Sequence, residues 1–211
     1  MLMSDAQTAF FPGESDKAPV LMLHGTGGDE TDLLPIASFL APDSPKLGIR
    51  GRIHENGANR YFKHTDDGGF DLDNLSTETD WLLSTIVTES AKHGIDPKQL
   101  LVLGFSNGAN VAAYAWLHKK APFKTAILLH PMMLDPQASA ANLNGVATFL
   151  THGDVDPIVS SANFTGLRRQ LTDAGAAVEA YTGHQSHQLT RAELSAAKTW
   201  LDKTGRLVLS H

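Results

Sequence analysis

A serine between two glycines is the first feature of this sequence that could do chemistry. The segment is Gly104-Phe105-Ser106-Asn107-Gly108, which has the form Gly-x-Ser-x-Gly. Apolar residues before it favour a strand, and residues after it favour a helix. In that context the glycines allow a strained turn that projects the serine hydroxyl above a sheet, where it can attack a carbonyl carbon. A serine that only caps a helix is the simpler interpretation, and the flanking strand and helix favour the nucleophile.

A glycine-rich segment follows the first strongly apolar run of the chain. Its sequence is His24-Gly25-Thr26-Gly27-Gly28-Asp29-Glu30. We expect the backbone N–H groups of Thr26 and Asn107 to form an oxyanion hole, which stabilises the negative oxygen of a tetrahedral intermediate. A dinucleotide-binding loop would need glycine where the sequence has Glu30. A glycine-rich turn without function is the remaining alternative.

A serine nucleophile needs a base, and the base needs a carboxylate that orients it. The candidate carboxylates follow a late apolar run, in the segment His152-Gly153-Asp154-Val155-Asp156-Pro157. We predict that Asp156 is the acid of a catalytic triad. Asp154 is the alternative, and either residue could instead stabilise a turn.

The candidate bases are His184 and His187, which lie between the last predicted strand and the last predicted helix. We expect most of the other eight histidines to be surface or structural residues. No His-x-x-x-His or His-Glu-x-x-His spacing occurs, so we expect no metal site. We also expect no cofactor.

Four of these segments together resemble the phospholipase/carboxylesterase family, which includes small bacterial carboxylesterases and acyl-protein thioesterases. In order they are HGTGGDE, GFSNGAN, HGDVDPIV and SHQLT. The resemblance implies a triad of Ser106, Asp156 and His187. The family pattern also has glycine before the catalytic histidine, and here Gly183-His184 has that form, so both histidines stay candidates. The dienelactone hydrolases typically use a cysteine nucleophile, and this chain has no cysteine.

A narrower resemblance covers residues 50–71, from Arg50-Gly51 to Phe70-Asp71. It is to the bacterial carboxylesterase branch associated with hydroquinone resistance. Residues 54–75, which overlap this segment, are polar, and we predict that they form a long loop. Long loops in compact domains are often functional. We expect Tyr61, Phe62 and Phe70 to line the site of an ester substrate; the alternative is that they only anchor their own loop.

The elements that must position these residues alternate between short apolar runs and longer segments of helical period. This pattern predicts an α/β fold, and with the motifs it predicts an α/β-hydrolase fold with a mostly parallel central sheet flanked by helices. The predicted strands are 20–24, 47–53, 100–105, 125–130, 146–151 and 177–181, and the predicted helices are 32–40, 77–93, 107–119, 160–174 and 191–203. Residues 131–145 are too few for a cap domain, so we expect none.

The composition limits the function classes. A chain of 211 residues with 42% hydrophobic residues can form one domain, residues 1–211. The net charge of −6 without a run of basic residues argues against nucleic acid as a partner, and no apolar run reaches the roughly 18 residues of a membrane span. The N-terminal residues do not resemble a signal peptide, so we expect a cytoplasmic protein. A homodimer is one arrangement that the sequence leaves open.

The sequence therefore predicts a serine carboxylesterase that hydrolyses short-acyl or aromatic esters through an acyl-enzyme on Ser106. An acyl thioesterase or lysophospholipase is the nearest alternative, because these reactions share the same carbonyl chemistry. A non-catalytic ligand-binding protein on the same scaffold is the alternative from another class.

Overall fold

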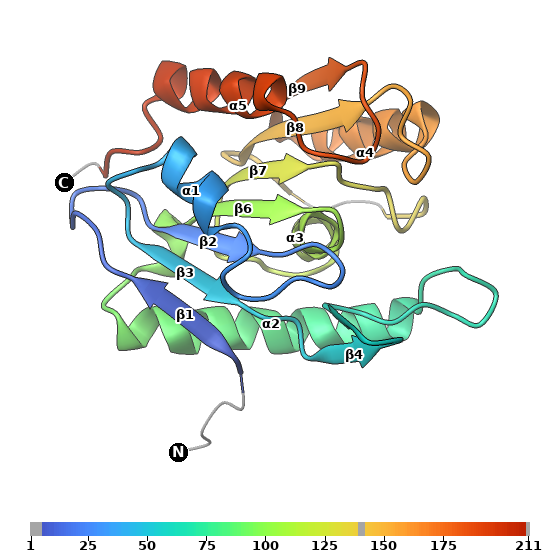
Figure 1. Ribbon diagram of the computed structural model, residues 1–211, viewed down its shortest axis with the longest axis horizontal. Coiled ribbons are helices and arrows are strands. Elements are labelled where there is room, and N and C mark those ends of the chain that lie inside the picture. Colours follow the sequence, from blue (N-terminus) through green and yellow to red (C-terminus); the bar gives the residue numbers. More distant parts are fainter. Residues whose placement is uncertain (1–5, 139–141, 210–211) are drawn as a thin grey trace.

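A single sheet of seven strands forms the centre of the protein (Figure 1). The computed structural model describes residues 6–138 and 142–209. The strand order is β1-β3-β2-β6-β7-β8-β9, and only β1 runs antiparallel to its neighbour. The strands are β1 (Thr8–Phe11), β2 (Val20–Leu23), β3 (Lys46–Ile49), β6 (Leu101–Phe105), β7 (Thr125–Leu129), β8 (Ala147–Gly153) and β9 (Ala177–Gly183). The predicted mostly parallel sheet is confirmed.

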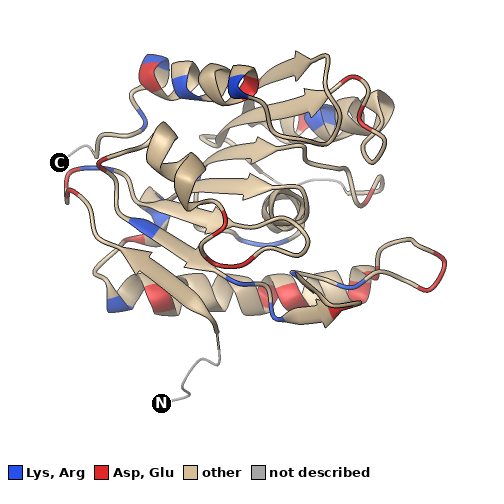
Figure 2. Cartoon of the chain, viewed as in Figure 1, with Lys and Arg blue, Asp and Glu red and all other residues tan. Residues whose placement is uncertain are grey.

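Helices cover both faces of this sheet. Those described are α1 (Leu34–Leu40), α2 (Leu72–Lys92), α3 (Asn107–His118), α4 (Ser161–Asp173) and α5 (Arg191–Thr204). Alternate residues of β6 pack on opposite faces: Leu101 and Leu103 belong to the core under α1 and α5, and Val102 belongs to the core under α2, α3 and α4. The central strands β6, β7 and β8 carry no charged residue, as expected for strands that are buried on both faces (Figure 2).

The segment 54–75, which we expected to be a long loop, contains three regular elements. Strands β4 (Ile53–Glu55) and β5 (Ala58–Arg60) form a hairpin, and α2 begins at Leu72 instead of residue 77. The earlier start has a local cause, because the Asp71 side chain accepts a hydrogen bond from the Asn74 N–H at 2.9 Å and caps the helix. The hairpin also ends the predicted strand 47–53 early, at Ile49.

The connection between β7 and β8 is short and irregular. Its described residues, 131–138 and 142–146, contain neither helix nor strand, in agreement with the expected lack of a cap domain. Among the described residues, no helix is both long and apolar enough to cross a membrane.

Candidate active site

Ser106 occupies the sharp turn between β6 and α3. Its backbone has φ 50° and ψ −111°, in a region that residues other than glycine rarely adopt. Close packing explains the two glycines of the motif: a Cβ at Gly108 would overlap the Leu23 carbonyl oxygen, and one at Gly104 would crowd the backbone of Ala109. The turn therefore exposes the Ser106 hydroxyl at the carboxyl end of the sheet.

The structure brings Ser106, His187 and Asp156 into one line of hydrogen bonds. The Oγ atom of Ser106 lies 2.8 Å from Nε2 of His187, and Nδ1 of His187 lies 2.7 Å from Oδ2 of Asp156. Each residue follows a different parallel strand, β6, β8 or β9. The Asp156 carboxyl group is fully buried, and His187 is mostly buried.

The surroundings of Asp156 keep its carboxyl group ionised. Burial alone would raise the pKa of Asp156. Hydrogen bonds from His130, His187 and the backbone N–H groups of Val159 and Ile158 outweigh burial, and they lower this pKa to about 2. Asp156 can therefore stabilise positive charge on His187 at neutral pH.

His184 and Asp154, the alternatives for base and acid, pair with each other instead. Their side chains are 82% and 47% exposed, and Nδ1 of His184 lies 3.0 Å from an Asp154 carboxylate oxygen. The structure thus places His187, and not His184, against Ser106.

Thr26 and Asn107, the residues predicted for the oxyanion hole, lie on the same cavity as Ser106. Asn107 is the first residue of α3, so its N–H has no acceptor within the helix. Within the glycine-rich loop, hydrogen bonds are donated by the N–H groups of His24, Gly27 and Gly28, to Tyr61, Asn59 and Gly25 respectively. In the described part of the chain this leaves the Thr26 N–H outside the loop's own bonding.

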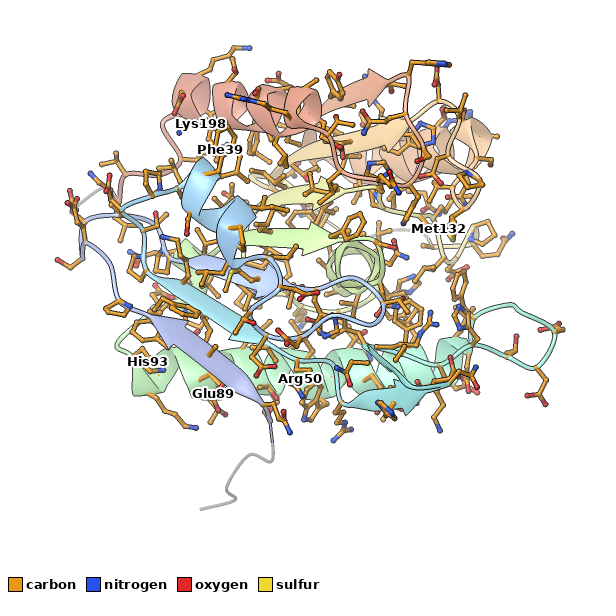
Figure 3. All side chains as sticks on the ribbon, viewed as in Figure 1. Phe39, Arg50, Glu89, His93, Met132 and Lys198 are labelled. Atoms are coloured by element: carbon orange, nitrogen blue, oxygen red, sulfur yellow. The ribbon has the colours of Figure 1, made fainter. Side chains whose placement is uncertain are left out.

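The cavity above Ser106 has a volume of about 380 Å³. Phe70 lines it, together with Arg60 and His64 from the same segment, and Met132 lines it from the connection after β7. Met132 is labelled in Figure 3, beyond the carboxyl ends of the central strands. A second cavity, of about 550 Å³, lies at the carboxyl end of α3 beside Lys119 and Lys124, away from Ser106.

Tyr61 and Phe62 do not line the cavity, so the expectation that they bind substrate needs correction. Both are core residues, exposed by 1% and 0%. The Tyr61 hydroxyl donates to the Ile49 carbonyl oxygen at 2.6 Å and accepts from the His24 N–H at 3.1 Å. Tyr61 and Phe62 follow the hairpin and pack in the core, whereas Phe70 lines the cavity.

Two buried residues behind Asp156, His130 and Glu193, were not singled out from the sequence. Nδ1 of His130 lies 3.0 Å from Oδ2 of Asp156, and Nε2 lies 3.1 Å from Oε2 of Glu193. The available signals were weak: His130 ends a predicted strand, and Thr190 with Glu193 forms a capping box at the start of α5.

His130, Asp156 and His187 also offer ligand-type atoms within 4.8 Å of one another. Each of their ring nitrogens already has a hydrogen-bond partner: Asp156 and Glu193 for His130, and Asp156 and Ser106 for His187. These contacts suit proton transfer better than metal binding.

Comparison with known proteins shows what the chain as a whole is similar to. The sequence model of the phospholipase/carboxylesterase family matches residues 9–205. MhqD of Bacillus subtilis (strain 168) is 38% identical over 188 residues, which are 89% of this chain and 94% of MhqD. A crystal structure of the Bacillus cereus carboxylesterase has a TM-score of 0.91 with 36% identity, covering 95% of each chain. A structure of YahD with malic acid has a TM-score of 0.90 with 42% identity, covering 94% of this chain and 99% of YahD.

Proposed function

Because this chain belongs to the phospholipase/carboxylesterase family of hydrolases, we propose that it is a serine carboxylesterase that hydrolyses short-acyl or aromatic esters. The observation that carries the proposal is the line of hydrogen bonds from Ser106 through His187 to Asp156. It lies at the floor of a cavity large enough for a small ester.

In the first half of the reaction, Ser106 Oγ attacks the ester carbonyl carbon while its proton passes to Nε2 of His187. Asp156 holds the Nδ1–H of His187 and stabilises the imidazolium that forms. The carbonyl oxygen becomes an oxyanion, which the N–H groups of Thr26 and Asn107 stabilise. When the tetrahedral intermediate collapses, the alcohol leaves with the proton of His187, and the acyl group stays on Ser106.

In the second half, water replaces the alcohol. His187 takes a proton from water as the oxygen attacks the acyl-enzyme carbonyl, and it returns that proton to Ser106 Oγ when the carboxylic acid leaves. The protein ends in its starting state, and no further reactant is required.

The walls of the cavity favour a short substrate with one polar end. Met132, Ile158 and Phe70 supply apolar surface, and Arg60 with His64 supplies a polar wall. The guanidinium of Arg60 is mostly buried; its Nη2 lies 2.8 Å from Nε2 of His64 and its Nη1 lies 3.6 Å from Oε2 of Glu55. Since the related YahD is described with malic acid, we infer that the Arg60 wall receives a carboxylate of the substrate.

The esterase and the thioesterase or lysophospholipase functions are separated by substrate profile. We expect hydrolysis rates to peak at short acyl chains and oxygen esters to be preferred over matched thioesters. A series of acyl-chain lengths on both ester types, measured as kcat/KM, tests this. Highest activity on long-chain thioesters or lysophospholipids would overturn the proposed substrate class.

A ligand-binding protein without turnover is tested by covalent labelling. A fluorophosphonate reacts only with an activated serine, so we expect labelling of the native protein at Ser106 and none of Ser106→Ala. Folded native protein that neither reacts with the probe nor hydrolyses any ester would leave only the binding function.

A further inference from the structure

The hydrogen bonds of the site continue beyond Asp156 to the start of α5. His130 follows β7, and its two ring nitrogens face two carboxylates: Nδ1 faces Asp156 at 3.0 Å, and Nε2 faces Glu193 at 3.1 Å. The side chains of His130 and Glu193 are completely buried. To orient the base, Asp156 needs a hydrogen bond only to His187. The presence of two further buried residues, His130 and Glu193, therefore requires an explanation.

The partners of both carboxylates indicate which atoms of His130 carry protons. Oδ1 of Asp156 accepts from the Ile158 and Val159 N–H groups, and Oε1 of Glu193 accepts from the Thr190 N–H and the Gln185 amide. The Gln185 amide nitrogen lies 3.3 Å from Nε2 of His130 but only 2.6 Å from Oε1 of Glu193, so its short bond is to the carboxylate. Carboxylates held by donors in this way are acceptors, and this favours donation from both ring nitrogens of His130.

The charge of His130 agrees with this pattern. Burial lowers the pKa of His130, but hydrogen bonds to Glu193 and Asp156 outweigh burial and leave the pKa raised. Burial raises the pKa of Glu193, but bonds from His130, the Thr190 N–H and Thr151 leave that pKa lowered.

We propose that His130 and Glu193 are positioning residues of the reaction at Ser106: His130 fixes Oδ2 of Asp156 for His187, and Glu193 fixes His130. The inference rests on the proposed esterase function. The ring nitrogens of His130 bond to Asp156 and Glu193 and not to Ser106, so both residues act through Asp156.

Oδ2 of Asp156 is shared between two imidazoles, and this sharing is the basis of the positioning role. His187 lies 2.7 Å from Oδ2 and must change its charge in every turnover, whereas His130 lies 3.0 Å away and has Glu193, not Ser106, at its other ring nitrogen. His130 therefore holds Oδ2 in place while His187 gains and loses its proton.

The charges are balanced as well. Two carboxylates and one imidazolium carry one net negative charge, the same as an isolated aspartate. The ionisable groups that face His130 are Asp156 from the loop after β8, Glu193 from α5 and His187, whose ring centroid lies 5.1 Å away. The neutral groups beside it are the Gln185 amide, 3.3 Å from Nε2, and the Phe105 ring. Without Glu193, His130 would neutralise the charge that Asp156 offers to His187.

The backbone of His130 is a further sign of constraint. Its φ of 51° is unfavourable for a residue with a side chain, and strain of this kind persists only where the surrounding contacts over-determine the conformation. The ring contacts at both nitrogens, together with the His130 N–H bond to the Thr151 carbonyl oxygen at 3.1 Å, supply those contacts.

The first test compares His130→Asn, Glu193→Gln and Glu193→Leu. Asparagine tolerates the positive φ but cannot reach both carboxylates, so we expect kcat to fall about 10- to 100-fold with KM within about threefold. Glutamine can donate to a neutral His130, so Glu193→Gln should keep kcat within about fivefold, whereas Glu193→Leu should fall as far as His130→Asn.

The control for general destabilisation is Leu82→Ala, a cavity in the core on α2. It should lose stability and keep kcat within about twofold. The inference is overturned if His130→Asn keeps kcat within about twofold of the native protein, or if Leu82→Ala loses as much activity as His130→Asn.

The pH profile distinguishes positioning from a purely structural role. Removing the positive charge of His130, 5.1 Å from His187, favours the protonated form of His187. The acid limb of kcat/KM in His130→Asn should therefore move to higher pH by at least about half a unit. A limb that stays in place, or that moves to lower pH, contradicts the inference.

NMR on protein with ¹⁵N-labelled histidine separates this inference from the proposed function. We expect both ring nitrogens of His130 to be protonated at neutral pH, with signals that disappear in His130→Asn. If the native protein hydrolyses esters but His130 carries one proton, this inference fails alone. If no ester is hydrolysed and Ser106 stays unlabelled by the fluorophosphonate, the proposed function fails whatever the NMR spectrum shows.

Discussion

The hydroxyl oxygen of Ser106 lies 2.8 Å from Nε2 of His187, although 81 residues separate them in the sequence. The contact arises because β6 and β9 run parallel, so that the segments after them lie at the same edge of the sheet. β8 pairs with β9 and brings Asp156 to the same edge. The proposed chemistry therefore depends on three parallel strands whose carboxyl ends lie together, because each of these strands is followed by one of the three catalytic residues.

If this contact activates Ser106, Ser106→Ala and His187→Gln should each lower kcat by at least about 10³-fold. His184→Gln is the matched control, since His184 is largely exposed and contacts Asp154 instead of Ser106. It should keep kcat within about twofold. Kinetics on one short-acyl ester provide the measurement. A loss in His184→Gln equal to that in His187→Gln would contradict the assignment of the base.

The proximity of Ser106, Asp156 and His187 could be anticipated from the sequence because each follows a recognisable parallel strand. In parallel sheets the residues after the strands gather at one edge. The start of α2 could also be anticipated, because Asp71, immediately before Leu72, is a preferred N-cap residue.

The sequence could not predict the buried positions of His130, Glu193 and Tyr61, and the reason is physical. A histidine between two carboxylates has no local pattern, since β7, β8 and α5 supply the three groups. Tyr61 lies in a polar segment, and only the pairing of β4 with β5 turns it into the core. Such positions depend on tertiary packing, which local patterns do not contain.

Gly108→Ala should disrupt the turn that carries Ser106. The added Cβ would overlap the Leu23 carbonyl oxygen, which belongs to a central strand and cannot move easily. We expect a loss of about 1–3 kcal/mol in the free energy of unfolding, with lower kcat. Gly69→Ala, where the Cβ would meet the end of the Thr65 side chain, should change both values little. Denaturant unfolding of the two variants checks this, and equal losses would contradict it.

The contribution of His130 to stability should depend on pH in a defined direction. The pKa of His130 is raised in the folded protein, so its contribution is complete below the unfolded value of about 6.5 and is lost as pH rises through the raised value. The difference in unfolding free energy between native protein and His130→Asn should therefore be larger at pH 6 than at pH 9. Urea unfolding at both pH values measures it. Leu82→Ala should show no such trend, and a His130→Asn difference that grows with pH would contradict the charge assigned to His130.

Arg60→Met should remove a preference for acidic esters. The Arg60 guanidinium lies on the cavity wall beside His64 and can form a charge-assisted hydrogen bond with a substrate carboxylate. On a nitrophenyl hemisuccinate, kcat/KM should fall about tenfold or more, whereas on the matching nitrophenyl butyrate it should stay within about threefold. Arg60→Lys should retain part of the preference. Equal losses on both esters would show that Arg60 supports the fold and not the choice of substrate.

Tyr61→Phe should destabilise the protein without weakening substrate binding. The hydroxyl joins the Ile49 carbonyl oxygen to the His24 N–H, and its loss leaves both backbone groups buried and unpaired. Each orphaned group costs about 1–3 kcal/mol, so the free energy of unfolding should fall measurably while KM stays within about twofold. Phe70→Ala is the contrasting variant, since Phe70 lines the cavity and its loss should raise KM. Denaturant unfolding and steady-state kinetics on both variants test whether Tyr61 is a core residue. A higher KM in Tyr61→Phe at unchanged stability would show instead that Tyr61 binds substrate.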